Sequence, residues 1–168
     1  TVALAITGLW ATSTADPALS AYNPSWDGSS TLRQEVPPAG TSVVVGEQTA
    51  TYATVSPPET TAFVLSPDRR YTDDETAQLR RFVRDGGTLV IAEDFGPHAD
   101  PLLDRVGAST RVDGRPLRDE HSYYRSPGLA VATGVTPSPL TAGVEQLTLN
   151  RGTALEPHGA RVLVESSS

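Results

Sequence analysis

The stretch AFVLSPDRRYTDDETAQLRRFVRDGGTLVIAEDFG, from Ala62 to Gly96, decides the fold class of this chain. Its first apolar run, Phe63–Leu65, predicts a short strand that ends at Ser66-Pro67, because proline cannot donate a hydrogen bond to a neighbouring strand. Its last apolar run, Thr88–Ala92, is continuous, which is typical of a strand buried on both faces of a parallel sheet.

The segment between these two runs carries the signals of a helix with defined ends. Thr72 and Glu75 have the spacing of a capping box, in which each side chain accepts a hydrogen bond from the backbone N–H of the other. Gly86-Gly87 ends the helix, since glycine adopts the left-handed conformation at little cost. Three apolar residues recur on one helix face between these ends: Leu79, Phe82 and Val83. Strand, helix and strand together predict a parallel β-α-β unit with a right-handed crossover.

The composition limits the classes of partner and of chemistry. The chain has 168 residues, the size of one domain, and its net charge of -7 argues against nucleic acid or an anionic membrane surface as a partner. All 13 basic residues are arginine, a bias typical of a GC-rich genome or of adaptation to high salt. Cysteine is absent, which excludes disulfides, zinc-thiolate sites and cysteine nucleophiles.

The first ten residues, Thr1–Trp10, are apolar and leave two alternatives open. They are either the end of a transmembrane helix or signal anchor, or an ordinary first strand or helix of the domain. The run is shorter than the roughly 20 apolar residues that span a bilayer. We therefore expect a membrane-proximal segment or linker over residues 1–21, followed by a single α/β domain over residues 22–168 that is truncated at its C-terminus.

Local patterns predict further elements outside the central unit. A capped short helix is expected to end near Val36, and a weak helix to cover Glu47–Val55. A helix is also expected from Pro97 to Gly107. Strands or extended segments are expected around Val43–Val45 and within residues 110–120, 129–135, 144–149 and 161–165, the last of them buried.

Glu93-Asp94 is the most informative polar pair. It follows a predicted parallel strand directly, and open α/β sheets bind ligands at the carboxyl ends of their strands. Neighbouring residues at a strand end point in different directions, so the two carboxylates do not form a glycosidase-type pair. The alternative role is charge complementarity with the helix that follows Gly96.

No common catalytic motif is present, because the chain lacks the nucleophile elbow, both phosphate-binding glycine loops, the zinc-protease motif and the calcium loop. Its histidines are His98, His121 and His158, and none has the spacing of a metal pair. His98 with Asp94 and Asp100 suggests a weak cation site on the turn, and a metal-assisted hydrolase that uses Asp94, His98 or His121 is an alternative function. The competing interpretation is that His98 is a solvated loop residue.

Two clusters of aromatic and arginine residues are candidate contact surfaces. The first is the loop Tyr22-Asn23-Pro24-Ser25-Trp26-Asp27-Gly28 with Arg33 after it, which is either a recognition loop or a loop whose aromatic residues pack on the sheet edge. The second, Tyr123-Tyr124-Arg125, is either a partner or ligand contact, since tyrosine and arginine are enriched in binding hot spots, or a hairpin edge packed on the sheet.

Several of these motifs in combination resemble a known family. They are the Tyr22–Gly28 loop, Tyr71-Thr72 with Glu75 and the glycine-ended helix, and Asp94-Phe95-Gly96. Together they resemble the domain of unknown function 4350 family, over the chain from Tyr22 to its end. The resemblance implies a class I glutamine amidotransferase-like fold, which is a three-layer flavodoxin-like α/β sandwich with a mostly parallel central sheet.

The resemblance also implies a setting and excludes one chemistry. Members of the family tend to be membrane-anchored, are often encoded near a MoxR-type AAA ATPase, and have no established activity. Related amidotransferases use a cysteine at a strand-to-helix elbow. This chain has no cysteine, so that reaction does not carry over.

We therefore expect a non-catalytic domain, without cofactor or metal, of a membrane-anchored protein that faces outside the cytoplasm. It is expected to bind a partner or small ligand, with a structural scaffold role in a membrane complex with an AAA ATPase system as a further alternative. The candidate contact residues are Glu93, Asp94, Phe95, Gly96, Asn23, Trp26, Arg33, Tyr123, Tyr124 and Arg125.

Overall fold

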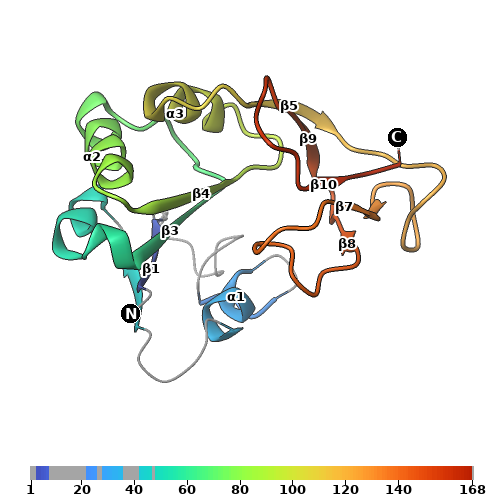
Figure 1. The fold of residues 1–168 in the computed structure, drawn as a ribbon, viewed down its shortest axis with the longest axis horizontal. Helices are drawn as coiled ribbons and strands as arrows, with labels where there is room; N and C mark the ends of the chain where they lie inside the picture. The colour runs from blue at the N-terminus through green and yellow to red at the C-terminus, as the bar shows by residue number, and fades with distance from the viewer. Residues whose placement is uncertain (1–2, 8–21, 26–27, 36–41, 47, 168) are drawn as a thin grey trace.

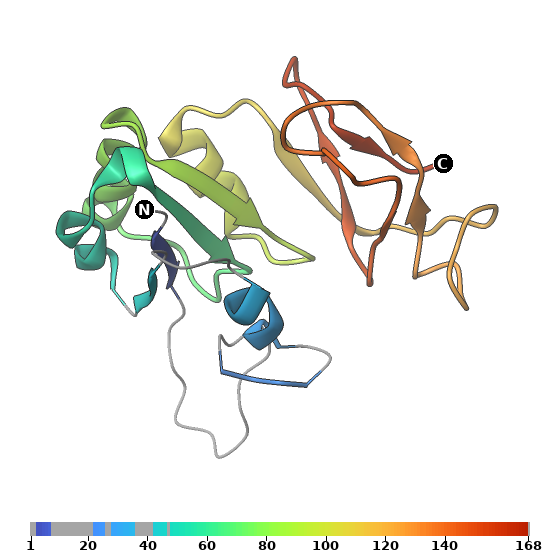
Figure 2. The same ribbon diagram turned by 60° about the horizontal axis from the view of Figure 1, so that its bottom comes forward.

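A computed structural model describes residues 3–7, 22–25, 28–35, 42–46 and 48–167 of the chain. Figure 1 shows two parts side by side, a parallel sheet with its helices and a C-terminal part built from short antiparallel strands. Figure 2 shows that the C-terminal part lies beyond the end of the sheet and does not extend it.

The sheet has four strands in the order β2-β1-β3-β4, and all of its ladders are parallel. Their bounds are β1 Ala3–Thr7, β2 Ser42–Gly46, β3 Thr60–Leu65 and β4 Thr88–Ala92. Strand β1 comes from the apolar N-terminal segment and lies between β2 and β3, so these five residues are part of the sheet. The expected boundary between residues 21 and 22 stays a prediction.

The predicted β-α-β unit is confirmed, with α2 (Asp73–Arg84) between β3 and β4. Both capping-box hydrogen bonds form: Glu75 N–H donates to the Thr72 hydroxyl at 3.3 Å, and Thr72 N–H donates to the Glu75 carboxylate at 2.8 Å. Arg69 adds two hydrogen bonds to the same carboxylate, at 2.8 and 2.6 Å. The pKa of Glu75 is lowered to about 2, and the hydrogen bonds from Arg69 are the main cause.

The core lies on one face of the sheet. Along β3 the residues Thr60, Ala62 and Val64 are buried, whereas Phe63 and Leu65 on the other face are half-buried. Helices α2 and α3 (Ala99–Val106) lie on the buried side (Figure 1). The fully packed cluster there consists of Tyr52, Ala62, Val64, Leu79, Phe82 and Leu102.

The predicted three-layer flavodoxin-like sandwich is wrong. After α3 the chain does not return to the sheet as another parallel strand, because residues 111–165 form three antiparallel pairs. These are β5 (Arg111–Pro116) with β9 (Thr153–Glu156), β6 (Val131–Ala132) with β8 (Leu147–Thr148), and β7 (Gly134–Val135) with β10 (Val164–Glu165). The protein is a small α/β domain in which the described helices α2 and α3 pack on one sheet face.

Other local predictions differ in detail. Short helices form at α1 (Ser30–Glu35) and α3, as expected, whereas the weak helix is a 3-10 helix, η1 (Thr49–Thr54), followed by the 3-10 turn η2 (Pro57–Glu59). Strand β4 is an edge strand with no fully buried residue, so its expected burial on both faces is wrong. The segment 161–165 is also not buried, and only its last two residues form a strand.

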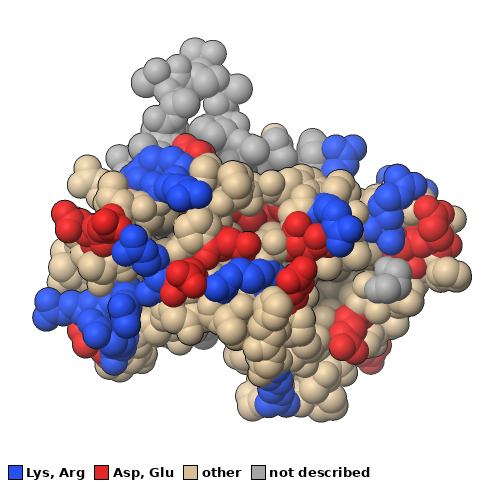
Figure 3. Space-filling model, turned by 90° about the horizontal axis from the view of Figure 1, so that it is seen from above, with Lys and Arg blue, Asp and Glu red and all other residues tan. Residues whose placement is uncertain are grey.

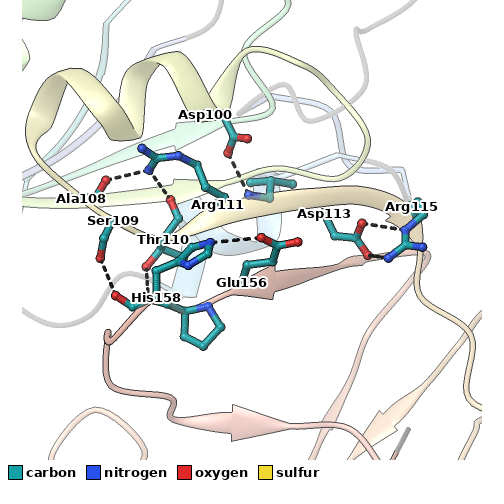
Figure 4. A network of polar contacts seen from close by, with 11 residues as sticks. Asp100, Ala108, Ser109, Thr110, Arg111, Asp113, Arg115, Glu156 and His158 are labelled. Atoms are coloured by element: carbon teal, nitrogen blue, oxygen red, sulfur yellow. Dashed lines mark hydrogen bonds and ion pairs between the residues drawn. The ribbon is translucent and has the colours of Figure 1, made fainter.

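Polar contacts join the C-terminal part to α3, as Figure 4 shows. The Asp100 carboxylate, in the first turn of α3, accepts a hydrogen bond from the backbone N–H of Val112 in β5 at 2.8 Å. The Arg111 guanidinium donates to the carbonyl oxygens of Ala108 and Thr110, both at 2.8 Å. These contacts fix the direction in which β5 leaves the helix.

We predict that Gly87→Ala destabilises the domain, by about 2 kcal/mol as expected for overpacking a core. An added Cβ at position 87 lies 2.4 Å from the ring of Phe82, which is 2% exposed and cannot move aside. Thermal unfolding followed by circular dichroism measures the loss. Gly152→Ala is the control, because its Cβ meets only Leu149 at 3.8 Å; equal melting temperatures for the two variants contradict the prediction.

Candidate functional site

Polar side chains meet where β3 and β4 end. Leu65 pairs with Ala92 at the last step of the parallel ladder, and Ser66 N–H donates to the Ala92 carbonyl at 2.7 Å. The next residues of each strand, Ser66 and Glu93-Asp94, therefore lie together at the carboxyl edge of the sheet. The sequence predicted Glu93 and Asp94 at this edge, and the structure adds Ser66 to them.

The two carboxylates accept hydrogen bonds from within the domain. The Ser66 hydroxyl lies 2.9 Å from Glu93 Oε1 and 3.1 Å from Asp94 Oδ1. Glu93 Oε1 also accepts from the backbone N–H of Asp94 and of Gly96, at 3.1 and 3.2 Å. Phe95 N–H donates to Asp94 Oδ1 at 2.6 Å. A Cβ at Gly96 would lie 2.8 Å from the Glu93 carboxylate, so only glycine fits this turn without displacing it.

The hydrogen bonds at this edge stabilise the ionised form of Asp94. Burial raises the pKa of Asp94, but hydrogen bonds from Phe95 N–H and the Ser66 hydroxyl outweigh it, so the pKa of Asp94 lies below its usual range. A general base for Ser66 needs a pKa near the working pH, and a carboxylate shifted downward is a weaker base. Glu93 Oε2 and His98 Nδ1 are buried with no hydrogen-bond partner among the described residues.

The histidines do not assemble with these carboxylates into a metal site. Within the part of the chain that the structure describes, no three His, Asp or Glu side chains converge as metal ligands. His98 precedes α3 as its N-cap residue, and His121 lies in the C-terminal part. His158 Nε2 contacts Glu156 Oε2 at 3.1 Å, beside β9 (Figure 4).

The aromatic loop near the N-terminus is organised around Asn23. This side chain is 3% exposed, and its Oδ1 accepts from Ser25 N–H at 2.8 Å. A Cβ at Gly28 would lie 1.9 Å from the Asn23 carbonyl oxygen, so the loop requires glycine there. Tyr22 is 52% exposed, which does not fit burial against the sheet edge. Trp26 and the side chain of Arg33 lie outside the described residues.

The second aromatic cluster stands at the tip of a hairpin. Val131 N–H donates to Ser122 O at 2.9 Å and Tyr124 N–H to Leu129 O at 2.8 Å, so residues 122–124 and 129–131 run antiparallel. Tyr123 and Tyr124 are 46% and 54% exposed, and the Arg125 guanidinium lies 5.1 Å from the centre of the Tyr124 ring. We call Tyr123, Tyr124 and Arg125 the Tyr–Arg tip. The alternative interpretation, a hairpin edge packed on the sheet, requires buried rings and does not fit the exposure of these two tyrosines.

A third segment lies beside the hairpin and was not predicted as part of a site. Leu149 N–H donates to Ala130 O at 2.8 Å, and Arg151 N–H donates to Gly128 O at 3.1 Å. A hollow of about 190 Å³ lies at this junction, lined by Ser126, Gly128, Leu129, Asn150 and Arg151. The two hydrogen bonds join positions 19 and 23 residues apart, so no local sequence pattern indicates this pairing.

Comparison with known proteins places the chain in a family. The family described as "Domain of unknown function (DUF4350)" matches residues 21–167. The chain belongs to this family. No curated protein matches it. Among solved structures, the "mmIFT52 N-terminal domain" is similar, with a TM-score of 0.69 and 13% identity over 98% of this chain and 72% of that one.

The family resemblance is thus confirmed, but the glutamine amidotransferase-like fold expected from it is not. At 13% identity the likeness to the solved structure concerns the fold alone, and that fold is not a flavodoxin-like sandwich. Across the ranges that the structure describes, no helix is both long and apolar enough to cross a membrane.

In this DUF4350 domain a buried carboxylate, Asp119, holds the base of the Tyr–Arg tip. It is fully buried, and its Oδ1 accepts from the backbone N–H groups of His121 and Ser122, both at 2.9 Å. Its Oδ2 accepts from the hydroxyl of Ser167 and from the Ser167 N–H at 3.2 Å. In the sequence Asp119 is one of several alternating charges, and only its distant partner Ser167 reveals this role.

We predict that Asp119→Asn destabilises the domain in a pH-dependent way. The hydrogen bond from Ser167, followed by those from Ser122 and His121, lowers the pKa of Asp119 to about 2. Because the folded-state pKa is depressed, the stabilisation is full above the unfolded value of about 3.9 and is lost as pH falls towards 2. The gap in denaturant midpoint between the parent protein and the variant should therefore be wide at pH 7 and narrow towards pH 2.

Glu145→Gln is the control for the Asp119 experiment, because it removes one carboxylate from an exposed position. Its denaturant midpoint should stay close to that of the parent protein at pH 7. A gap for Asp119→Asn that is the same at both pH values would contradict the assignment of an ionised, hydrogen-bonded carboxylate.

Proposed function

We propose that this domain binds a partner protein through the Tyr–Arg tip and carries out no reaction of its own. The observation that supports this is the exposure of Tyr123 and Tyr124, 46% and 54%, on a hairpin whose backbone is tied down by hydrogen bonds. Tyrosine supplies a large contact area at low entropic cost, and tyrosine and arginine are enriched among the residues that dominate binding energies.

The sheet edge supports the absence of catalysis in this proposal. Ser66 is the nearest potential nucleophile, and its hydroxyl faces carboxylates that already accept backbone hydrogen bonds. The lowered pKa of Asp94 makes this carboxylate a weaker base for Ser66.

A small polar ligand at the sheet edge is the second candidate function. The observation that favours it is the pair of buried atoms without a partner among the described residues, Glu93 Oε2 and His98 Nδ1. Phe95, which is 41% exposed, lies between Glu93 and His98 in the sequence. The edge is the usual place for ligands in parallel sheets.

The cellular setting is also a proposal. We propose that the domain belongs to a membrane-anchored protein and faces outside the cytoplasm, in a complex with an AAA ATPase system. This proposal rests on the family to which the chain belongs and on the membrane anchoring and the neighbouring AAA ATPase genes expected of its members. Strand β1 gives it no support, because Ala3–Thr7 lies within the sheet.

Site-specific photocrosslinking tests the partner-binding proposal in the full-length protein expressed in its own host. Tyr124 replaced by benzoylphenylalanine should give one adduct of defined mass, in the membrane fraction. The same label at Leu140, which is 83% exposed, should give none. Equal labelling at both positions would rule out a contact specific to the tip, and recovery in the soluble fraction would contradict the membrane anchor.

We predict no hydrolysis of glutamine or of activated esters above the buffer rate. Ser66→Ala and Asp94→Asn should leave this background unchanged, because neither group is set up for proton transfer. Liquid chromatography of the products after a long incubation at pH 7 provides the measurement. Turnover that disappears in either variant would make the domain an enzyme and overturn the non-catalytic proposal.

A further inference from the structure

The arginines of the C-terminal part divide into two groups. Three of them form ion pairs: Arg111 with Asp104 at 2.9 Å, Arg115 with Asp113 at 2.7 Å and Arg118 with Glu120 at 3.3 Å. Figure 3 shows the same mixing of acidic and basic side chains over one face of the molecule. Arg125, Arg151 and Arg161 are exposed and have no acidic partner among the described residues, but Arg161 donates to the Pro137 carbonyl oxygen at 3.1 Å, which leaves Arg125 and Arg151. In a chain of net charge -7, these two cations are uncompensated locally.

One of these arginines lines the hollow, and the other is next in sequence to a residue that lines it. Arg151 lines it, and its N–H donates to Gly128 O at 3.1 Å. Arg125 sits in the hairpin turn directly before Ser126, which lines the hollow from the other segment. The Arg125 guanidinium rests on the Tyr124 ring, at 5.1 Å from its centre. Two cations, two exposed tyrosines and a polar hollow therefore share one end of the C-terminal part.

The backbone at both positions is unfavourable for arginine. Arg125 has a φ of 65° and Arg151 a φ of 52°, in the left-handed region that favours glycine or asparagine. A residue held in such a conformation costs stability, and such residues cluster at binding sites. Folding alone therefore does not call for arginine at either position, which suggests that the side chains serve another purpose.

We infer that the Tyr–Arg tip, together with Arg151, binds an acidic peptide segment of the partner protein. This inference rests on the proposed partner-binding function and specifies its chemistry. Each guanidinium presents a planar fork that binds a carboxylate with two hydrogen bonds, and the tyrosine rings contact the peptide stem. The net charge of -7 repels an acidic segment from the molecule as a whole, and the unpaired guanidinium groups at this end oppose that repulsion locally.

A peptide titration tests the inference with a defined probe. A fluorescein-labelled decapeptide of alternating glutamate and glycine should bind the domain, and the matching glutamine peptide should not, as measured by fluorescence anisotropy. Arg125→Ala with Arg151→Ala should weaken binding at least tenfold. Raising the salt concentration should weaken it further, because exposed charges are screened.

The chain offers a matched control for the loss of charge. Arg80→Ala with Arg84→Ala removes two exposed arginines of α2 that also have no acidic partner among the described residues, and it changes the net charge equally. Binding should stay within twofold of the parent protein. Equal weakening by the two double variants, or equal binding of the glutamine peptide, would overturn the inference in favour of general electrostatic attraction.

A second variant separates binding from folding. Arg125→Gly with Arg151→Gly removes the same side chains from positions where glycine is the favoured residue. Its melting temperature should equal or exceed that of the parent protein while peptide binding is lost. Retained binding in this stable variant would show that the arginines do not contact the peptide.

Further outcomes identify other occupants. Competition by single-stranded DNA as strong as by the glutamate peptide would replace the acidic peptide by a general polyanion. The parent protein could also sediment as a dimer while the variant Arg125→Ala with Arg151→Ala sediments as a monomer. That result would assign the tip to contact with a second copy of the chain. If Tyr124 crosslinks a partner while the glutamate peptide fails to bind, partner binding stands and the acidic chemistry is wrong; if both fail, the proposed function itself is wrong.

Discussion

The packing of α2 against one face of β3 determines where everything else in this domain lies. Val64, Leu79 and Phe82 are buried in this contact, and the capping box at Thr72 and Glu75 fixes where the helix begins. The return through Gly86-Gly87 then sets β4 parallel to β3, in register to the last pair. The same contact brings the ends of both strands to one edge. The opposite face, around Phe63 and Leu65, is only half-buried.

The sequence reveals the β-α-β unit because all its signals are local. A capping box, an apolar face and a glycine pair each lie within a few residues, and they agree with one another. Beyond Gly107 the local sequence signals no longer determine the structure. Strands β6, β7, β8 and β10 contain two residues each, too few to show a period, and their partners are remote. The family resemblance therefore led us to expect that the parallel sheet continues after α3. The observed antiparallel pairs depend instead on contacts between residues that are distant in the sequence.

The two candidate surfaces differ in where their polar groups are directed. At the sheet edge Glu93 and Asp94 follow β4, and Ser66 and the turn itself bind one oxygen of each carboxylate, whereas Glu93 Oε2 has no partner among the described residues. At the Tyr–Arg tip the backbone is satisfied internally and the side chains face outward. The sequence indicated Tyr123 to Arg125 as a contact, but Arg151 became part of the surface only through its backbone bond to Gly128.

The bond between Asp119 and Ser167 joins residues 48 positions apart in the chain. Closing so long a loop costs conformational entropy that local contacts do not repay, whereas the β-α-β unit closes over short distances. We therefore expect the tip to take its shape late, after Ser167 has docked on Asp119. A nascent or partly unfolded chain would not display the surface, so the ability to associate would itself report that folding is complete.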